Sequence, residues 1–517
     1  MEVTGVCCVV GVVVTLVFYV LRFLNWVWFK PKKIERFLRD QGLKGSSYKF
    51  LFGDLKEMVQ LTTQATSKPI ALSDDIVPRV LPFVHKSVLT HGKICFTWMG
   101  NKPLVHVSEP SMIPEILANY NKFQKQKGPR HSLIKLLGKG LFSTENDQWV
   151  KHRKIINPAF HVEKLKKMVP AFYISCSEMI NKWEEMLMKE SSCEVDVWPH
   201  LKTFASDVIS RTAFGSSFEE GRKIFELQRE QIQLVLKAIQ SMYIPGSRFL
   251  PTKSNKRIKE TSQEMEVLIR SIIDKRVTTM ESQKIGNNDL LGILLDSNHE
   301  EIKRHGNHNF GISIEDIIEE CKLFYFAGQE TTADLLVWTM ILLSQHTKWQ
   351  ELARNEVLSV FGEKKPHIDG FSNLKTINMI FNEVLRLYPP AMILGRMIHE
   401  EMKLGNMTLP AGTYIQVNTL LLHTDLDIWG EDAKEFKPER FSEGVSKATK
   451  GQTSYIPFGG GPRICIAQNF ALMEAKTALV MILQRFSFEL SPSYSHAPHS
   501  VITLQPQFGA HLILRKL

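Results

Sequence analysis

The stretch "PFGGGPRICIA", residues 457–467, places three glycines and a proline just ahead of a single cysteine, Cys465. The residues that follow, "IAQNFALMEAKTALVMILQRF", have the apolar spacing of a helix, so Cys465 is expected at or just before a helix N-terminus. The helix dipole favours an anion there, lowers the thiol pKa and favours the thiolate, which is the form that binds metals. The glycines would let the backbone approach a flat ligand closely.

Several kinds of site could use such a loop. It lacks the Lys-Ser/Thr pair and the G-x-G-x-x-G spacing of phosphate-binding loops. No second Cys or His lies at zinc-finger spacing from Cys465. One thiolate as the only protein ligand suits a metal whose other ligands come from a macrocycle, as in cysteine-ligated haem. The alternative is a turn in which the cysteine is incidental.

The composition is that of a globular protein: 517 residues, 44% apolar and 23% charged, with a formal net charge of +10. The basic residues occur in short groups such as "KPKK" and "KHRK", without a long basic tail, so nucleic-acid binding is not expected. Seven cysteines without C-x-x-C spacing argue against a disulfide framework and favour a reducing compartment. One large domain fits the length as well as several small ones.

The N-terminal sequence predicts a membrane-spanning segment. Residues 3–21, "VTGVCCVVGVVVTLVFYVL", contain no charge, and as a helix they would extend about 28 Å, close to the hydrocarbon thickness of about 30 Å. A cleaved signal peptide is the alternative, but no basic residue precedes the run and no A-x-A site follows it. Basic residues after the run predict that the rest of the chain stays in the cytosol. We therefore expect residues 1–29 to form an anchor and juxtamembrane segment, and residues 30–517 the catalytic domain.

The remainder is predicted to be mainly α-helical with small β-sheets. Apolar residues recur at helical spacing over 162–187, 264–280 and 314–345. Ser313 and Asp316 form a capping-box pattern at the start of the third of these helices. Short strands are expected at 93–100, 103–108, 394–398, 413–418 and 511–517.

The long helix at 314–345 contains "AGQETT", residues 327–332. Gly328 in a helix interior costs about 1 kcal/mol relative to alanine. Glu330 and Thr331 are polar groups in an apolar stretch, and burying them is unfavourable unless they are hydrogen-bonded. An acid beside a hydroxyl could relay a proton, or the motif could be a kink in which threonine bonds back to the preceding turn. The residues alone leave both readings open.

A second polar pattern lies in "NEVLRLYPP", residues 382–390. Glu383 and Arg386 are three residues apart, so they can pair on one helix face. Exposed pairs of this kind are common, but the apolar neighbours indicate a partly buried pair that needs further hydrogen bonds. Arg440 in "KPERF" is a candidate third partner, and this role would be structural.

Taken together, these motifs resemble those of the cytochromes P450, a family of haem-thiolate monooxygenases. "FGGGPRICIA" is similar to that family's haem loop, Phe-x-x-Gly-x-Arg-x-Cys-x-Gly, and "AGQETT" to its oxygen-activating motif. "EVLR" and "PERF" resemble its Glu-x-x-Arg and arginine clamp, and "WVKHR" its Trp-x-x-x-Arg helix. The resemblance implies a cytochrome P450 fold behind a single N-terminal transmembrane helix, with haem b as the cofactor.

The resemblance also assigns roles to individual residues. Cys465 would be the axial haem ligand, Thr331 would hydrogen-bond the oxygen molecule, and Glu330 would serve proton delivery. The residues that would hold the haem propionates are Trp149, Arg153, Arg396 and Arg463. Phe458 would pack near the thiolate, and the clamp would consist of Glu383, Arg386 and Arg440. Ala467 departs from the family's glycine and could crowd the ring.

Three segments resemble a plant clan that acts on isoprenoids: "NPAFHVEKLKKMVPAF", "DVISRTAFGSSFEEG" and "LFYFAGQETTADLLVWTMILL". The resemblance implies a monooxygenase of the endoplasmic reticulum membrane that hydroxylates or further oxidises a terpenoid (a triterpenoid, secoiridoid or isoprenoid hormone) with O2. Electrons would come from NADPH through a separate flavoprotein reductase. The segments 128–140, 230–250 and 389–396 would line the pocket. The alternatives are an oxygen-independent haem-thiolate isomerase or dehydratase, and a non-catalytic haem- or lipid-binding membrane protein.

Overall fold

The structure is a computed structural model of the full chain. It describes residues 2–125, 137–188, 190–216, 218–240, 252–282 and 289–517. These residues form two compact units. Unit 1 comprises Met1–Ser67, Val77–Gln126 and Ile393–Asn418, and unit 2 comprises Lys68–Ile76, Lys127–Met392 and Thr419–Leu517.

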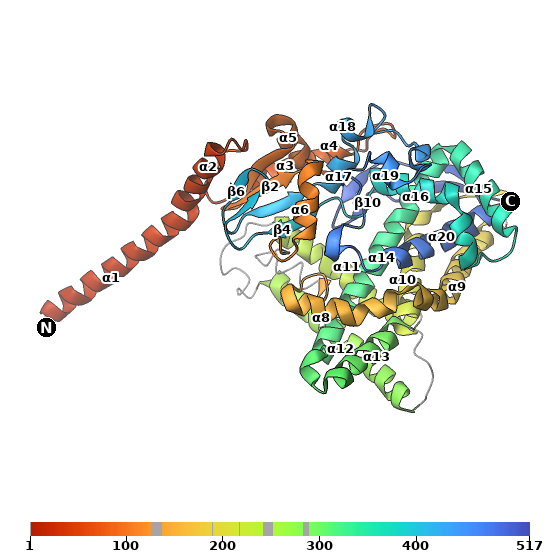
Figure 1. The fold of residues 1–517 in the computed structure, drawn as a ribbon, viewed down its shortest axis with the longest axis horizontal. Coiled ribbons are helices and arrows are strands. Elements are labelled where there is room, and N and C mark those ends of the chain that lie inside the picture. Colours follow the sequence, from red (N-terminus) through yellow and green to blue (C-terminus); the bar gives the residue numbers. More distant parts are fainter. Residues whose placement is uncertain (1, 126–136, 189, 217, 241–251, 283–288) are drawn as a thin grey trace. The chain divides into compact units, whose positions relative to one another are not determined.

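Unit 1 combines the N-terminal helices with a small sheet (Figure 1). Its helices are α1 (Glu2–Leu24), the π-helical turn Asn25–Phe29, α2 (Lys30–Asp40), α3 (Leu55–Ala65), α4 (Val77–Val80), α5 (Pro82–His91), the 3-10 turn Pro110–Met112 and α6 (Ile113–Ala118). Its strands are β1 (Ile94–Met99), β2 (Lys102–Val107), β4 (Leu394–Met397), β5 (Met402–Leu404), β6 (Met407–Leu409) and β7 (Tyr414–Val417). Four of them form a sheet in the order β1-β2-β7-β4, in which β2 and β7 are parallel.

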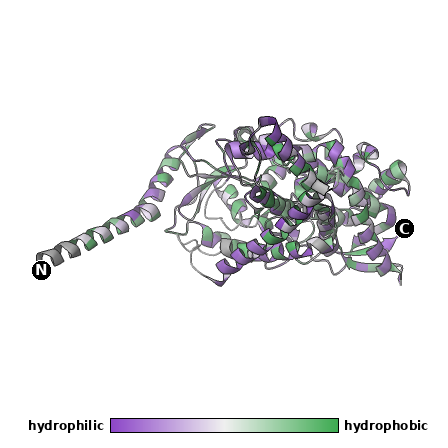
Figure 2. Cartoon of the chain, turned by 90° about the horizontal axis from the view of Figure 1, so that it is seen from below, coloured by the Kyte–Doolittle hydropathy of each residue, from purple (hydrophilic) through white to green (hydrophobic). Residues whose placement is uncertain are grey.

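One described helix is long and apolar enough to cross a membrane, over Val10–Asp40. Within α1, the described side chains from Val10 to Leu21 are exposed, and most of them are apolar, including Leu16, Phe18 and Leu21. In Figure 2 the purple of polar residues becomes more frequent toward α2. An exposed apolar helix of this length fits a membrane anchor. The predicted boundary between residues 29 and 30 stays a prediction.

Unit 2 holds most of the helices. They are α8 (Asn146–Ile156), α9 (Val162–Leu187), α10 (Val197–Phe214), α11 (Phe218–Gln240), α12 (Lys253–Ser282), α13 (Leu290–His305), α14 (Ile314–Gln345), α15 (Thr347–Phe361), α16 (Lys375–Leu387), α17 (Thr419–His423), α18 (Leu426–Trp429), α19 (Val445–Ala448) and α20 (Gln468–Arg485). Its 3-10 turns are Asn157–Phe160, His308–Phe310, Ile368–Asn373, Pro438–Phe441 and Gly461–Arg463. Its strands are β3 (Ser192–Asp196), β8 (Phe486–Leu490), β9 (Pro498–Ser500), β10 (Leu504–Pro506) and β11 (His511–Lys516).

The long helix α14 forms the centre of unit 2 (Figure 1). It begins with the predicted capping box, in which Ser313 accepts from the N–H of Asp316 and Asp316 accepts from the N–H of Ser313. Most of its side chains are buried, and Trp338 is fully enclosed. Packing against α10, α16 and α20 places this helix between the elements that carry the other motifs.

The predicted fold class, mainly α with small sheets, is confirmed. The helices predicted at 162–187 and 314–345 have those bounds, and 264–280 lies within the longer α12. The five predicted strands overlap β1, β2, β4, β7 and β11. In the second sheet, of order β3-β11-β8, β11 pairs with β3 across more than 300 residues of sequence, and local periodicity does not predict such a pairing.

Candidate active site

The loop of residues 457–467 turns back on itself ahead of Cys465. Gly459 and Gly461 have φ angles of +73° and +64°, a left-handed conformation that side chains other than glycine rarely adopt. The backbone N–H of Cys465 donates to the carbonyl of Phe458 at 2.9 Å, which closes the loop. Helix α20 begins at Gln468, so Cys465 lies three residues before it, as predicted.

Ala467, the residue that departs from the family's glycine, is the N-cap of α20. Its φ of −97° and ψ of 14° are accessible to alanine without strain. Its carbonyl accepts the first helical bond, from Ala471 at 2.9 Å. The backbone at this position therefore does not require glycine.

Cys465 differs from the other described cysteines in its exposure. Cys95, Cys176 and Cys321 are buried, and burial raises the pKa of each thiol, that of Cys95 to about 12. Burial also raises the pKa of Cys193. Cys465 is the exposed one of these five. Buried thiols stay protonated and poor as ligands, so Cys465 is the described cysteine best suited to hold a metal.

Three of the predicted haem-contacting residues gather beside this loop. Arg153 of α8 donates from Nη1 to the carbonyl of Ile464 at 2.9 Å. Burial lowers the pKa of Arg153, and the nearby charge of Cys465 acts in the opposite direction. The guanidinium of Arg463 lies 4.2 Å from the ring centroid of Trp149. These residues therefore share one region of unit 2.

Arg463 also has a partner that the sequence did not indicate. Its Nη2 forms a short ion pair with Glu145 and donates to the carbonyl of Thr144 at 2.9 Å. The side chains of both charged residues are almost fully buried. An anionic ligand held by Arg463 would therefore share this arginine with Glu145.

Arg396, the fourth predicted propionate contact, lies in unit 1 on strand β4. Its Nη1 donates to the carbonyl of Gly395 at 2.9 Å, and the side chain is buried. Its part in a site with Cys465 stays a prediction.

On α14 the predicted oxygen motif contains both a close packing contact and a back-bonded threonine. A Cβ on Gly328 would lie 2.8 Å from Cδ1 of Ile209 on α10, so this glycine allows the two helices to approach. The hydroxyl of Thr331 donates to the carbonyl of Ala327 at 2.8 Å. Leu323, Ala327 and Thr331, four residues apart, are only half-buried on a helix that is otherwise mostly buried. They form one open stripe along α14.

Glu330 lies outside that stripe and is buried. Its carboxylate pairs with Lys202 of α10, with Oε1 2.9 Å from Nζ, and accepts from Nε2 of Gln505 at 2.6 Å. One turn further along, Asp334 is fully buried. Burial, and then the charge of Glu330, raise the pKa of Asp334 well above its ordinary value, against the effects of Thr503 and Lys202. Glu330 is therefore ion-paired, whereas the surroundings of Asp334 favour its neutral form.

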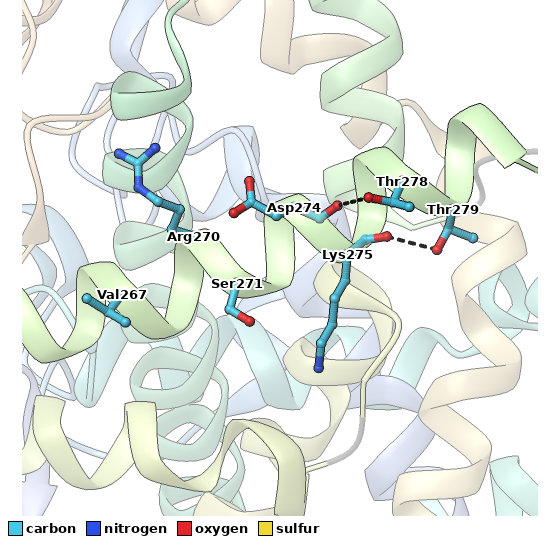
Figure 3. A pocket seen from close by; sticks show the side chains of 7 residues that line it. All are labelled: Val267, Arg270, Ser271, Asp274, Lys275, Thr278 and Thr279. Atoms are coloured by element: carbon cyan, nitrogen blue, oxygen red, sulfur yellow. Dashed lines mark hydrogen bonds between the residues drawn. The ribbon is translucent and has the colours of Figure 1, made fainter.

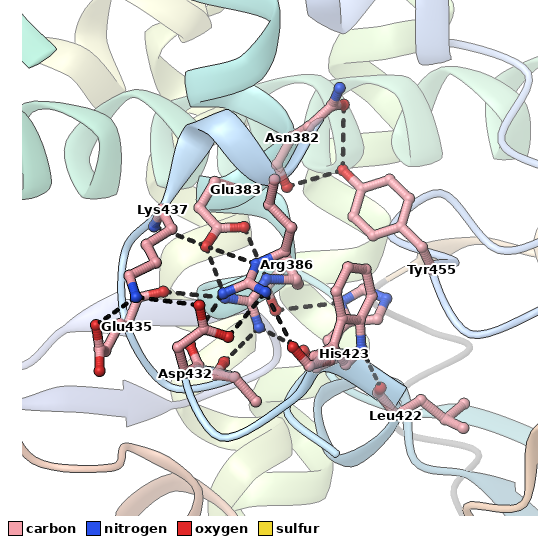
Figure 4. A network of polar contacts seen from close by, with 12 residues as sticks. Asn382, Glu383, Arg386, Leu422, His423, Asp432, Glu435, Lys437 and Tyr455 are labelled. Atoms are coloured by element: carbon pink, nitrogen blue, oxygen red, sulfur yellow. Dashed lines mark hydrogen bonds and ion pairs between the residues drawn. The ribbon is translucent and has the colours of Figure 1, made fainter. Parts of the chain in front are cut away.

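The predicted clamp residues meet in one polar network, in which Glu383 and Arg386 are fully buried and Arg440 is partly buried (Figure 4). Arg386 forms a two-pronged ion pair with Glu383, with both N–O distances at 2.7 Å. Its remaining donors reach the carbonyls of His423 (2.8 Å), Ala433 (2.5 Å) and Glu435 (3.1 Å). Nε of Arg440 lies 3.7 Å from the Glu383 carboxylate. These hydrogen bonds satisfy the condition for burying such a pair.

The segments expected to line the pocket lie partly outside the described residues. Residues 128–136 and 241–250 fall outside the described residues, and 389–396 passes from unit 2 into unit 1. A described hollow on unit 2 is lined by one face of α12: Val267, Arg270, Ser271, Asp274, Lys275, Thr278 and Thr279 (Figure 3). It contains none of the predicted site residues.

Sequence reasoning missed Glu145, Lys202, Gln505 and His423. Each contacts a predicted site residue across more than 30 positions of sequence. None stands in a motif, so only a search for unpaired polar residues in apolar surroundings could have flagged them.

Comparison with known proteins agrees with the geometry. The family model described as Cytochrome P450 matches residues 81–507. The chain therefore belongs to the cytochrome P450 family and is a monooxygenase, and the family implies a haem cofactor. An exposed cysteine in a glycine loop, with Arg153, Trp149 and Arg463 nearby, fits that group.

The similar proteins include plant members of the family. The chain is 58% identical to Cytochrome P450 CYP72A219 of Panax ginseng over 512 residues, which cover 99% of this chain and 98% of that protein. It is 54% identical to the 7-deoxyloganic acid hydroxylase of Catharanthus roseus, covering 97% and 96%. The solved structure of retinoic acid-bound cyanobacterial CYP120A1 has a TM-score of 0.75 at 21% identity, covering 92% of this chain and 99% of that one, and shows the shared fold.

Proposed function

We propose that this chain hydroxylates, or further oxidises, a terpenoid: a triterpenoid, a secoiridoid or an isoprenoid hormone. Support comes from the similarity over nearly full length to the hydroxylase named for 7-deoxyloganic acid. The apolar residues Met392 and Ile393, in a segment that resembles the family's pocket lining, are compatible with a hydrophobic substrate.

The observation that carries the enzymatic part of the proposal is the exposed thiol of Cys465 in its glycine loop. We infer that its thiolate holds the iron of haem b, with Phe458 packed beside it. Bound haem supplies oxygen activation, to which the thiolate contributes electron density. Trp149, Arg153, Arg396 and Arg463 hold the propionates through charge-assisted hydrogen bonds.

On α14, Thr331 hydrogen-bonds the oxygen molecule and Glu330 supplies protons toward it. Thr331 belongs to the open stripe, whereas Glu330 is held by Lys202 and Gln505. For Glu330 to deliver a proton it must exchange these partners. Lys202 is itself partly exposed, so the exchange can involve water.

Electrons come from NADPH through a separate flavoprotein reductase, and α1 anchors the protein in the endoplasmic reticulum membrane with the catalytic part in the cytosol. The absence of charge over residues 3–21 and the basic residues after them support this orientation. A protease added outside sealed microsomes should digest the catalytic part, and full protection would reverse the topology.

The haem ligand is tested by the spectrum of the reduced protein with carbon monoxide. The unmutated chain should show the red-shifted Soret band of thiolate ligation, and Cys465→Ala should abolish it. Cys193→Ala, a partly buried cysteine, is the matched control and should keep the band. A spectrum typical of histidine ligation in the unmutated chain would overturn the assignment.

The substrate class is tested by product formation. Microsomes that contain this chain and a plant reductase are incubated with NADPH and one of three substrate sets: triterpenoid, secoiridoid and isoprenoid-hormone scaffolds. A product heavier by one oxygen, formed only with NADPH, identifies the class by mass spectrometry. Fatty acids and phenylpropanoids are offered in parallel, and their conversion, with no terpenoid converted, would refute the proposal.

A further inference from the structure

His423 is a buried residue that none of the roles above uses. It ends α17, and its side chain is fully enclosed beside the clamp of Glu383 and Arg386 (Figure 4). Its Nε2 lies 2.9 Å from the backbone nitrogen of Ile456, and its Nδ1 lies 3.2 Å from the carbonyl oxygen of Arg386. The imidazole therefore bridges α16 and the segment that leads into the Cys465 loop.

The two contacts define one tautomer. The backbone N–H of Ile456 can only donate, so Nε2 must present its lone pair. The carbonyl of Arg386 can only accept, so Nδ1 must carry the proton. Burial, and then the neighbouring Arg386 guanidinium, lower the pKa of His423 to about 3, so the ring remains neutral at physiological pH.

Further contacts attach the same two segments. The carbonyl of His423 accepts from Nη1 of Arg386 at 2.8 Å, so the two residues are bonded in both directions. The hydroxyl of Tyr455 donates to the carbonyl of Asn382 at 3.0 Å. Its ring also stacks on His423, with centroids 5.2 Å apart. The consecutive residues Tyr455 and Ile456 are thus both held to α16, Tyr455 directly and Ile456 through His423.

Ile456 lies two residues before Phe458, whose backbone carbonyl contacts Cys465. Phe458 follows Ile456 after one proline, and its carbonyl accepts the N–H of Cys465 at 2.9 Å. A shift of Ile456 therefore changes the position of the carbonyl that closes the Cys465 loop.

We propose that His423 is a positioning residue that links the clamp to the Cys465 loop, by accepting the N–H of Ile456 while donating to the carbonyl of Arg386. The inference rests on the proposed role of Cys465 as the haem ligand. The imidazole of His423 holds Ile456, and with it the start of the Cys465 loop, in the position from which the thiolate can bind the iron.

Two amide substitutions separate the two hydrogen bonds. In His423→Gln the amide oxygen can occupy the place of Nε2 and accept from Ile456. In His423→Asn the amide nitrogen can occupy the place of Nδ1 and donate to Arg386, which leaves the buried N–H of Ile456 without its acceptor. His423→Phe keeps a ring for Tyr455 but removes both bonds.

The readouts are the carbon monoxide spectrum of the purified, haem-loaded protein and the rate of haem transfer to apomyoglobin. We expect His423→Gln to keep most of the thiolate band. In His423→Asn and His423→Phe we expect much of the absorbance to move to the band of haem that has lost its thiolate ligand. We also expect these two variants to transfer haem on the order of tenfold faster. A merely structural role would make Gln and Asn equally harmful.

The outcomes distinguish this inference from the proposed function. If the unmutated protein lacks the thiolate band, the role of Cys465 fails. If the unmutated protein has that band and His423→Phe keeps it with unchanged haem transfer, only the role of His423 fails. If His423→Phe does not fold, as judged by circular dichroism, the Gln and Asn variants decide, and equal loss in both overturns the inference.

Discussion

Glu383 and Glu330 are both buried glutamates on helices of unit 2, but their surroundings differ. Glu383 faces Arg386 and Arg440 and also accepts the backbone N–H of Lys437 at 2.9 Å, so cations outnumber the acid. Glu330 is paired with Lys202, whose side chain is 18% exposed, and burial, followed by the charge of Glu330, raises the pKa of the neighbouring Asp334. The first acid is fully committed to its partners, whereas the second can exchange them. The partners of each buried carboxylate therefore indicate its role: those of Glu383 fit a structural role, and those of Glu330 fit proton transfer.

The largest effect is expected from Arg386→Leu. The substitution leaves Glu383 buried with the more distant Arg440 and the backbone N–H of Lys437, and breaking a buried pair in this way costs about 3–5 kcal/mol. We expect little or no haem-loaded protein, measured by the carbon monoxide spectrum and thermal unfolding. Arg386→Lys should not rescue it, because one ammonium cannot reach the carboxylate and three carbonyls together. Normal yield of the leucine variant would contradict the structural role.

Glu330→Gln is expected to retain the fold and lose turnover. The amide keeps the size and can still accept from Lys202, but it cannot deliver a proton, and such groups contribute about 10²-fold or more. The measurement is product formed per NADPH consumed, with the carbon monoxide band as the control for haem binding. Turnover like that of the unmutated chain would remove Glu330 from the reaction.

Thr331→Ala should have a smaller, different effect. The hydroxyl belongs to the half-buried stripe of α14 and bonds only to its own helix, so its loss should leave stability nearly unchanged. We expect NADPH consumption to continue while product falls severalfold and peroxide is released. Thr332→Ala, one position along and buried, is the neighbouring control. Unchanged coupling in Thr331→Ala would refute the proposed contact with oxygen.

The smallest effect is expected from Asp334→Asn, and it should be stabilising. Because the pKa of Asp334 is raised in the folded state, its contribution to stability is full below the unfolded value of about 4 and is lost as pH rises toward the folded value. The asparagine removes this loss, so the variant should exceed the unmutated chain by about 1 kcal/mol at pH 8 and by less at pH 5. A difference in melting temperature that shrinks with rising pH would contradict the raised pKa.

Local sequence predicted much of the fold. The bounds of α9 and α14 followed from apolar periodicity, and the start of α14 from Ser313 and Asp316, because these signals act within a few residues. The strand pairings and the partners of Glu330 and Arg463 did not follow. Lys202 and Gln505 lie 128 and 175 residues from Glu330, and no periodicity reports such contacts.

The sequence by itself identified the class of protein through the resemblance of its motifs, marked Cys465 as the candidate haem ligand, and predicted the apolar N-terminal helix. It could do so because glycines, a lone thiol and long apolar runs act through the local backbone. Only the tertiary structure decided that Gly328 makes room for Ile209, that Ala467 sits unstrained at a helix start, and that His423 bridges the clamp and the loop. These depend on which distant segments pack together, and burial then makes each hydrogen bond between them obligatory.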